Sequence, residues 1–309
     1  MSRILQKIIV DEDFIWNKNL ENNQEKFLVK LSSETIDQLR MNKKELGNID
    51  KLSFPKLKNE INELKIRKIL SGVGFFIIDK KNFSGFSKDE IKKIYGIICN
   101  MLGTLYIQNV NSDKIVEIKD EGKSMTLGGR YHQTREGGSY HTDSPHCTNV
   151  PDLVGMLCIN PAKKGGTSKF VSTYTIHNQL LKEQKDKLEA LYEKFYFDKR
   201  GEFKTNESQT IFEPIFVFDG YKLHCRFLKD YIVAGHEIQN QPLSKLQEAS
   251  LNLLEEISKN QNNIFSYDLK SDDMIFFDNH RILHGRTGFE DYDDENRKRL
   301  FLRTWIKFE

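Results

Sequence analysis

Two imidazoles and a carboxylate lie close together in the stretch YHTDSPHC, residues 140–147. On a β-strand alternate side chains point the same way, so His141 and Asp143 would share one face and Thr142 would lie on the other. One neutral imidazole and one carboxylate suit a divalent first-row metal. The pair is a weak signal by itself, and a metal site needs a third ligand from elsewhere in the chain.

The C-terminal stretch FFDNHRILHGRTGF contains two candidates for that ligand, His280 and His284. Two histidines and one carboxylate can hold one face of an octahedral iron(II) and leave three positions open. An α-keto acid that chelates through two oxygens would leave one position for dioxygen. Such a site also needs an anchor for the far carboxylate of the keto acid, ideally a planar, bidentate arginine.

The last strand-like segment, RLFLRTWIKF at 299–308, offers that anchor. Its even positions form a mostly apolar face that could pack against helices. Its odd positions are Arg299, Phe301, Arg303, Trp305 and Lys307. Spacing alone leaves two interpretations open for the odd face, a solvated edge strand or the wall of a polar cavity beside the metal histidine.

Strand-like segments dominate from about residue 150 and are separated by turns. Their expected bounds are 153–159, 168–173, 210–218, 222–227, 264–269, 274–279 and 299–308. Helices are expected between them at about 174–195 and 243–260. Strands without a βαβ rhythm favour an antiparallel sandwich or jelly roll. The expected fold class is therefore mainly β with flanking helices around a double-stranded β-helix (jelly-roll) core.

The chain is expected to form one domain over residues 1–309, with a mostly helical N-terminal extension over 1–70. A buried strand is predicted at 74–79. The following segment, SKDEIKKIYGIICNML, begins with a Ser87–Glu90 capping box and has apolar residues at helix spacing. Residues 104–140 are largely polar and Gly-rich, and loops of this length are often active-site lids.

Bulk composition limits the partners. The 309 residues carry a net charge of +2, so no strong field recruits nucleic acid or an anionic membrane by charge alone. No run of about 18 apolar residues and no secretory signal is visible. The four cysteines form no CxxC pair and fit a reducing compartment. We expect a cytoplasmic protein with a small-molecule substrate, without nucleic-acid or membrane partners, and the oligomeric state stays open.

Several motifs in order resemble the taurine dioxygenase-like (TauD/TfdA, clavaminate-synthase-like) family of iron(II)/2-oxoglutarate-dependent oxygenases. They are GFFIID, MLGTLYIQN, KDEG, GGSYHTDSPH, VPDLVGMLCINPAKKGGTSKFVS, MIFFDNHRILHGRTGFED and RKRLFLRTWI. The similarity runs from about Gly72 to the C-terminus and weakens in the first 60 residues. One departure is the turn Ser271-Asp272-Asp273, where the family usually has Pro-Gly-Asp. Since Asp tolerates turn conformations well, only local strain is in question there.

The resemblance implies a cofactor set of iron(II), 2-oxoglutarate and dioxygen (O2). It implies that His141, Asp143 and His284 are the iron ligands and catalytic residues. Arg299 matches the arginine that binds the C5 carboxylate of 2-oxoglutarate, and Ser168 of GGTS matches a hydroxyl residue that hydrogen-bonds the same carboxylate. A carboxylate at Asp143 argues against a halogenase, in which a small residue leaves that iron position to halide.

Other residues are less closely defined by the resemblance. Arg303 matches a position that binds an anionic group of the substrate in some members. Asn279 is a candidate for a residue that orients the metal ligands without binding the metal itself. Arg297 also has odd parity, but it lies nearer the turn and is a weaker candidate than Arg299. The role of His146 stays open.

The implied reaction is oxidative decarboxylation of 2-oxoglutarate to succinate, coupled to hydroxylation or desaturation of a substrate. Arg303 beside Arg299, with Arg130 and Arg135 in the expected lid, favours a small, polar, anionic or amino-acid-like substrate. Two alternatives remain. One is a non-catalytic jelly-roll protein that binds a metal or ligand, and the other is an oxygenase that acts on a macromolecule.

Overall fold

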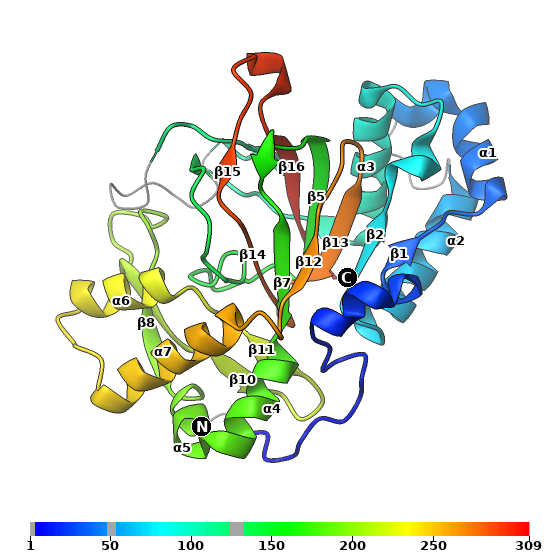
Figure 1. The fold of residues 1–309 in the computed structure, drawn as a ribbon. Coiled ribbons are helices and arrows are strands. Elements are labelled where there is room, and N and C mark those ends of the chain that lie inside the picture. The colour runs from blue at the N-terminus through cyan, green and yellow to red at the C-terminus, as the bar shows by residue number, and fades with distance from the viewer. Residues whose placement is uncertain (1–3, 48–53, 110, 124–132, 309) are drawn as a thin grey trace.

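Two β-sheets face each other at the centre of the protein, and helices cover their outer faces (Figure 1). The computed structural model describes residues 4–47, 54–109, 111–123 and 133–308. The larger sheet has the order β1-β2-β13-β5-β16-β3, and β4 also pairs with β16. The smaller sheet has the order β12-β7-β14. All their pairings are antiparallel except that of β1 with β2.

The strands of the larger sheet are β1 (Leu28–Val29), β2 (Phe75–Ile78), β3 (Thr104–Leu105), β4 (Ile115–Ile118), β5 (Leu153–Asn160), β13 (Met274–Asp278) and β16 (Leu300–Lys307). Those of the smaller sheet are β7 (Ser168–Ser172), β12 (Phe265–Tyr267) and β14 (Ile282–Arg286). Short two-stranded pairs are β6 (Lys164–Gly165) with β15 (Phe289–Glu290), β8 (Lys194–Asp198) with β9 (Thr210–Pro214), and β10 (Phe216–Phe218) with β11 (Leu223–Cys225). The helices are α1 (Ser33–Met41), α2 (Pro55–Leu64), α3 (Lys88–Leu102), α4 (Thr173–Glu183), α5 (Lys185–Ala190), α6 (Lys229–Ile238) and α7 (Lys245–Lys259).

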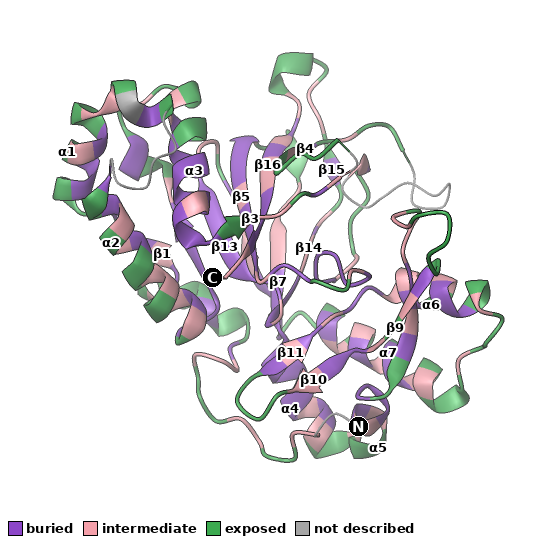
Figure 2. Cartoon of the chain, turned by 180° about the vertical axis from the view of Figure 1, so that it is seen from behind, coloured by how far each residue is buried: buried purple, intermediate pink, exposed green. Residues whose placement is uncertain are grey.

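Apolar side chains fill three layers. Helices α1–α3 pack on the outer face of the larger sheet, where Ile94 and Ile98 belong to the same buried cluster as Phe276. Helices α4–α7 pack beneath the smaller sheet with Val171 and Leu283. Residues of both sheets meet in the middle layer: Phe75, Val154, Phe170, Phe265, Ile275, Phe277, Ile282, Phe301 and Trp305. Figure 2 shows that these strands are largely buried. The expectation of a jelly-roll core with flanking helices is confirmed.

The helix ends follow local chemistry. Helix α3 begins at the expected capping box, in which Ser87 accepts from the Glu90 amide and Glu90 accepts from the Ser87 amide. Helix α7 has the same arrangement at Ser244 and Gln247. The helix expected at 174–195 is two helices, since α4 ends at Glu183 and a short α5 follows at Lys185–Ala190, and the expectation is wrong only at its end, where strand β8 begins at Lys194.

Some other helices and strands could not be recognised from the sequence. Helix α6 has no side-chain N-cap and contains Ile232, Val233 and Gly235, which are poor helix formers. Within the expected lid at 104–140, strands β3 and β4 pair with β16 and so extend the larger sheet. The N-terminal segment also contributes strand β1, beside its helices.

The turn that departs from the family pattern is well supported. Asp272 adopts a positive φ of 73° at the position where the family usually has glycine. The carboxylate of Asp273 accepts from the backbone amides of Lys80 and Lys270 at 2.9 and 2.8 Å. The turn therefore tolerates Asp without losing its hydrogen bonds.

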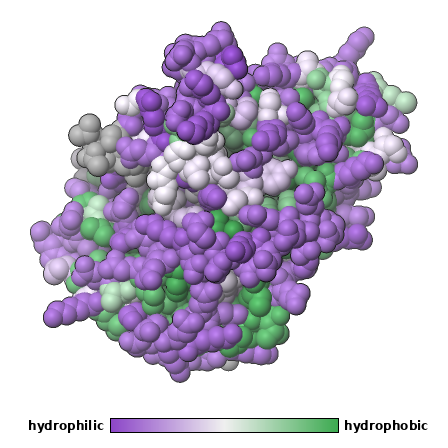
Figure 3. All heavy atoms as spheres, viewed as in Figure 1, coloured by the Kyte–Doolittle hydropathy of each residue, from purple (hydrophilic) through white to green (hydrophobic). Residues whose placement is uncertain are grey.

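The visible face in Figure 3 is mainly hydrophilic, with hydrophobic residues scattered among charged ones. Within the described ranges, each helix is too short or too polar to cross a membrane. All four cysteines are free thiols.

Candidate metal centre and its cavity

His141 and His284 meet through their backbones. The His141 amide donates to the His284 carbonyl at 3.0 Å, and the His284 amide donates to the His141 carbonyl at 2.9 Å. His284 lies on strand β14, whereas His141 forms only this isolated bridge, so His141 and Asp143 come together without a regular strand between them. The opposite side of the segment is fixed at Thr142, whose amide donates to Phe227 and whose hydroxyl accepts from the Phe227 amide.

The three expected ligands converge. The Oδ1 atom of Asp143 lies 3.6 Å from Nε2 of His141 and 3.6 Å from Nε2 of His284. The donor atoms of all three residues lie within 4.8 Å of one another. One divalent ion can therefore contact two imidazole nitrogens and one carboxylate oxygen from the same side.

The second oxygen of Asp143 is held by the larger sheet. Trp305 donates its indole N–H to Oδ2 at 2.7 Å, and Nη1 of Arg303 lies 3.3 Å from the same atom. Burial alone would raise the pKa of Asp143, but Arg303 and the two histidines outweigh it and lower this pKa well below its usual value. Asn279 fixes the backbone of Asp143, because its side chain accepts from the Asp143 amide at 2.7 Å and donates to the Asp143 carbonyl at 3.0 Å.

The donor set suits a metal at neutral pH. Burial, followed by the neighbouring His141, lowers the pKa of His284 to about 3, so its imidazole is neutral. With the proton of His141 on Nδ1, that atom faces the Ser139 carbonyl at 3.4 Å and Nε2 is left to bind. Two imidazole nitrogens beside an ionised carboxylate match the ligands of a non-heme iron(II) site.

A cavity opens directly beside these three residues. Its walls are Ile118, His141, Asp143, Met156, Ser168, Phe170, His284, Gly285, Arg286, Arg299 and Arg303. Three arginines face one aspartate, so the lining has an excess of positive charge. A positively charged lining of this kind favours an anionic ligand.

Arg299 lies at one end of this cavity and is only 3% exposed. Its guanidinium lies over the rings of Phe301 and Phe289 at 4.2 and 5.1 Å. Gly166 lies beside it with a φ of 72°, a backbone conformation that L side chains rarely adopt. Ser168 lines the same cavity, as the sequence predicted for a second contact to the co-substrate.

The other candidate arginines lie in different environments. Arg297 is exposed and stacks on the ring of Tyr292 at 3.9 Å, so it does not line the cavity. Arg135 pairs with Asp120 at 3.1 Å and is 66% exposed. Arg130, and with it the stretch 124–132 of the expected lid, lies outside the described residues.

A second chamber adjoins the first and shares His141, Asp143 and Arg303 with it. It is lined further by Gln108, Thr142, Ser144, Pro145, His146, Glu202, Leu228, Tyr231 and Trp305. Arg303 lies between the two chambers and donates from Nε to Gln108 at 2.9 Å. His146, whose role the sequence leaves open, lies in this wall.

Two residues of the site were missed in the sequence. Arg286 is buried and donates to the backbone carbonyls of Thr134 and Glu136 beside the cavity. Its position two residues after His284 on one strand places it on the same face, and that spacing could have identified it. Trp305 lies two residues after Arg303 on strand β16 and so shares its face. The hydrogen bond from its indole to Asp143 could not be predicted from the spacing.

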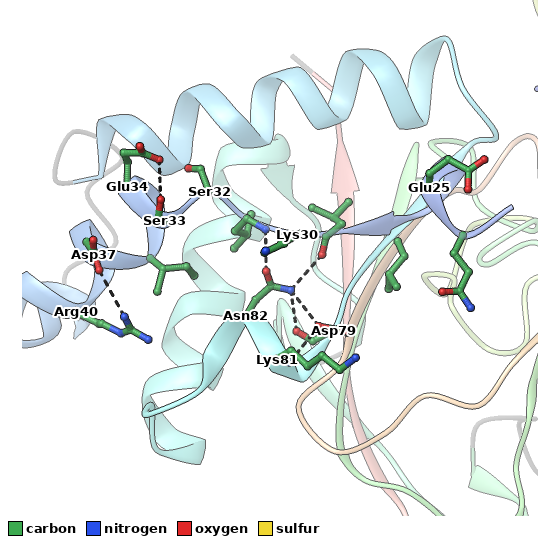
Figure 4. Close-up of a pocket in the computed structure, with 15 residues that line it drawn as sticks. Glu25, Lys30, Ser32, Ser33, Glu34, Asp37, Arg40, Asp79, Lys81 and Asn82 are labelled. Atoms are coloured by element: carbon green, nitrogen blue, oxygen red, sulfur yellow. Dashed lines mark hydrogen bonds and ion pairs between the residues drawn. The ribbon is translucent and has the colours of Figure 1, made fainter.

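A larger hollow of about 860 Å³ lies elsewhere, between strand β1, helix α1 and the turn after β2 (Figure 4). Asn82 lies in its middle and binds backbone atoms of Val29, Leu31 and Asp79. These bonds hold the N-terminal segment against the sheet. The clusters of possible metal ligands found among the described residues are not in this hollow.

Comparison with known proteins gives consistent matches. The sequence model of the family "Taurine catabolism dioxygenase TauD, TfdA family" matches residues 39–305. FR-33289 synthase from Streptomyces rubellomurinus (strain ATCC 31215) is 30% identical over 251 residues, which are 79% of this chain and 72% of that protein.

Solved structures of two enzymes share the fold. An asparagine oxygenase in complex with Fe(II), 3-hydroxyasparagine and succinate has a TM-score of 0.71 at 13% identity, covering 91% of this chain and 93% of that one. The non-heme iron oxygenase OrfP in complex with Fe has a TM-score of 0.64 at 12% identity, covering 92% and 93%. At these identities the likeness concerns the fold alone.

Proposed function

Because the chain belongs to the taurine catabolism dioxygenase TauD, TfdA family, we propose that it oxidises a small, polar, anionic or amino-acid-like substrate by hydroxylation or desaturation. Its enzyme class is that of the iron(II)/2-oxoglutarate-dependent dioxygenases. One observation carries the assignment of the site: His141, Asp143 and His284 converge at a cavity lined by three arginines.

The residues have distinct roles in this proposal. His141, Asp143 and His284 would hold iron(II), and Arg299 with Ser168 would bind the far carboxylate of 2-oxoglutarate. When bound, iron, 2-oxoglutarate and dioxygen supply an oxidative decarboxylation to succinate and carbon dioxide that is coupled to removal of hydrogen from the substrate.

The surrounding side chains prepare the site. Trp305 donates to Oδ2 of Asp143, and Nη1 of Arg303 lies 3.3 Å from Oδ2 and 3.4 Å from Oδ1, the oxygen that faces the two imidazoles. Met156 and Phe170 are apolar parts of the cavity wall and exclude water from the reacting groups. Positioning of the ligands is therefore built into the sheets before the co-substrate binds.

The second chamber supports a small polar substrate. Its wall combines the guanidinium of Arg303, the amide of Gln108 and the carboxylate of Glu202 with the apolar Leu228. Such a mixture suits a compact molecule with an anionic group and further polar groups. Related proteins act on molecules of this size: the structures of the fold include an asparagine oxygenase with 3-hydroxyasparagine and OrfP with L-Arg.

The organisation of the whole chain belongs to the same proposal. Residues 1–309 would form a single oxygenase domain, in which 1–70 pack on the larger sheet and 104–140 cover the cavity. The hydrogen bonds of Arg286 to the carbonyls of Thr134 and Glu136 support a covering role for that segment. Four free thiols and a reduced iron suit a cytoplasmic location.

The direct test is succinate formation with iron(II), 2-oxoglutarate and dioxygen. We expect slow succinate release by the protein alone and faster release when a compound from a panel of amino acids, carboxylates, sulfonates and phosphonates is added. A protein that only binds ligands would release none. Stimulation by a macromolecule and by none of the small anions would contradict the proposed substrate class.

Arg303→Ala tests the substrate side of the proposal. Since Arg303 also contacts Asp143, iron affinity must be measured in parallel with the KM of the stimulating compound. We expect the KM of an anionic substrate to rise more than the dissociation constant of iron(II). An unchanged KM would exclude Arg303 from substrate binding.

A further inference from the structure

A tight turn follows the candidate metal centre at residues 144–147. Ser144 has a positive φ of 55°, and the amide of Cys147 donates to the Ser144 carbonyl at 3.1 Å. Arg226 closes the turn from outside, since Nη1 donates to the carbonyls of Pro145 and Cys147 at 3.2 and 3.3 Å. The backbone that presents His146 and Cys147 is therefore fixed by contacts on both sides.

A third side chain reaches this turn from a distant part of the chain. Glu202 lies in the connection between strands β8 and β9, and its Oε2 is 3.0 Å from Nε2 of His146. One ligand atom from each of His146, Cys147 and Glu202 lies within 4.8 Å of the other two. The turn at 144–147 and the β8–β9 connection thus bring together an imidazole, a thiol and a carboxylate.

His146 gives a second, independent indication of a ligand. Its residue is only 6% exposed, and its Nδ1 atom is buried without a hydrogen-bond partner among the described residues. Buried polar atoms are nearly always satisfied, so an orphaned ring nitrogen in such a cluster calls for a partner. A metal ion bound at Nδ1 would provide one, since a metal can bind either ring nitrogen of a histidine.

The types of ligand atom in this cluster indicate which metal ion it would bind. Imidazole, thiolate and carboxylate are the ligands that Zn²⁺ uses, and three protein ligands leave its fourth tetrahedral position to water or another ligand. The triad of His141, Asp143 and His284 contains no sulfur and suits iron(II) instead. We propose that His146, Cys147 and Glu202 form a second metal site, separate from the triad, for a thiophilic divalent ion such as Zn²⁺.

Binding to this cluster is coupled to protons. The imidazole nitrogen, the thiol and the carboxylate must each be free of a proton in order to bind a metal ion, so binding of the ion releases protons.

Occupancy of this site has a consequence for the neighbouring chamber. His146 and Glu202 are both part of the wall of the second chamber. A bound ion would tie the β8–β9 connection to the 144–147 turn and fix the positions of these two side chains in that wall. The ion would therefore act on substrate binding without occupying the iron triad.

Cobalt(II) is a suitable probe, because a thiolate ligand gives it an intense near-ultraviolet charge-transfer band. The experiment uses the full chain with His284→Ala, which disables the iron triad and leaves the second site intact. We expect one equivalent of cobalt to produce the sulfur-to-metal band, and one equivalent of Zn²⁺ to remove it. Proton release on Zn²⁺ binding, followed in weakly buffered solution, gives a second readout.

Matched variants separate a built site from a reactive thiol. Cys147→Ser should abolish the band, whereas Cys99→Ser, at a fully buried cysteine in helix α3, should keep it. His146→Gln and Glu202→Gln should each weaken Zn²⁺ binding by at least about tenfold, as loss of one ligand does. Circular dichroism identifies any variant that fails to fold, and Glu202→Gln is the mildest change.

The outcomes are distinct. No charge-transfer band in the His284→Ala protein, or an equal band in Cys147→Ser, would overturn the proposal. A band that depends on Cys147 but is indifferent to both His146→Gln and Glu202→Gln would show a lone thiol and would also overturn it. Succinate formation by the unmodified chain is measured separately, so failure of this site leaves the oxygenase assignment untouched.

Discussion

The two faces of strand β16 differ in what they contribute. The inner face presents Arg303 and Trp305 to Asp143, which is a buried carboxylate at the candidate metal centre. The outer face places Thr304 and Ile306 against helix α3, within the buried layer that covers the larger sheet. Neighbouring residues on one strand thus belong to the site and to the core in alternation.

Adjacent residues of this strand therefore have different roles, one at the metal centre and the next in the stability of the core. Charges on the inner face are tolerated because each has an opposite charge or a polar partner close by. The outer face has no such charge, and its contribution is apolar burial together with hydrogen bonds from the Tyr95 hydroxyl to Thr304 at 3.0 Å and to the Leu302 carbonyl at 3.5 Å. Substitutions on the inner face should therefore change metal or co-substrate binding, whereas those on the outer face should change folding stability.

The largest effect is expected at the carboxylate that the inner face supports. Asp143→Ala removes one ligand of the triad and leaves Arg303 and Trp305 without their acceptor. Succinate formation should fall to the background of the reaction without enzyme, as measured by chromatography of the products. The matched control is Ile306→Val on the outer face, which should retain activity. Full turnover by Asp143→Ala would remove this residue from the triad.

Arg299 allows a sharper test, since Arg297 is a matched control only two residues away. Arg299→Ala should weaken 2-oxoglutarate binding by about 2–5 kcal/mol, the usual loss when one partner of a buried charge pair is removed. This loss corresponds to a rise in KM of roughly 30-fold to several thousand-fold.

Arg297 is exposed on Tyr292, and Arg297→Ala should leave the KM for 2-oxoglutarate unchanged. The readout for both variants is the initial rate of succinate formation against co-substrate concentration. Equal KM values for the two variants would mean that Arg299 does not anchor 2-oxoglutarate.

Trp305→Phe changes one hydrogen bond and little volume. It removes the indole donor that lies 2.7 Å from Oδ2 of Asp143, so Asp143 loses part of its fixed orientation. Iron(II) affinity should fall about 10- to 100-fold, as is usual when a group that orients a metal ligand is lost. Anaerobic iron titration measures this effect. Unchanged affinity would show that Arg303 alone orients the carboxylate.

The smallest effect is expected on the outer face. Thr304→Val leaves the buried hydroxyl of Tyr95 with only the long contact to the Leu302 carbonyl at 3.5 Å, which should cost about 1–3 kcal/mol in the free energy of unfolding. Iron affinity should not change. Adding Tyr95→Phe should recover part of the loss, because both polar partners are then absent. Weaker iron binding by Thr304→Val would show that the outer face also affects the metal centre, so the two faces would not have separate roles.

Alternation in the sequence was sufficient to predict much of this arrangement. The period of two in RLFLRTWIKF placed Arg303 and Trp305 on one face and Leu302 and Ile306 on the other, and the structure has them so. The capping box at Ser87 gave the start of helix α3 for similar local reasons. Such signals depend on neighbours within a few residues, which is why the sequence alone contains them.

Contacts between distant segments could not be derived in this way. The pairing of His141 with His284 joins positions 143 residues apart through two backbone hydrogen bonds, and no local pattern specifies it. Motif resemblance supplied the expectation instead. The bond from Trp305 to Asp143 and the approach of Glu202 to His146 depend on loop paths, so they became visible only in the folded chain.

The central claim is that these two imidazoles and this carboxylate hold an iron that also binds 2-oxoglutarate. Anaerobic addition of iron(II) and then 2-oxoglutarate tests it most directly, because the chelate gives a visible charge-transfer band. We expect this band in the unmodified protein and its loss in Asp143→Ala. No band in the unmodified protein, or an undiminished band in Asp143→Ala, would show that the triad does not hold such an iron.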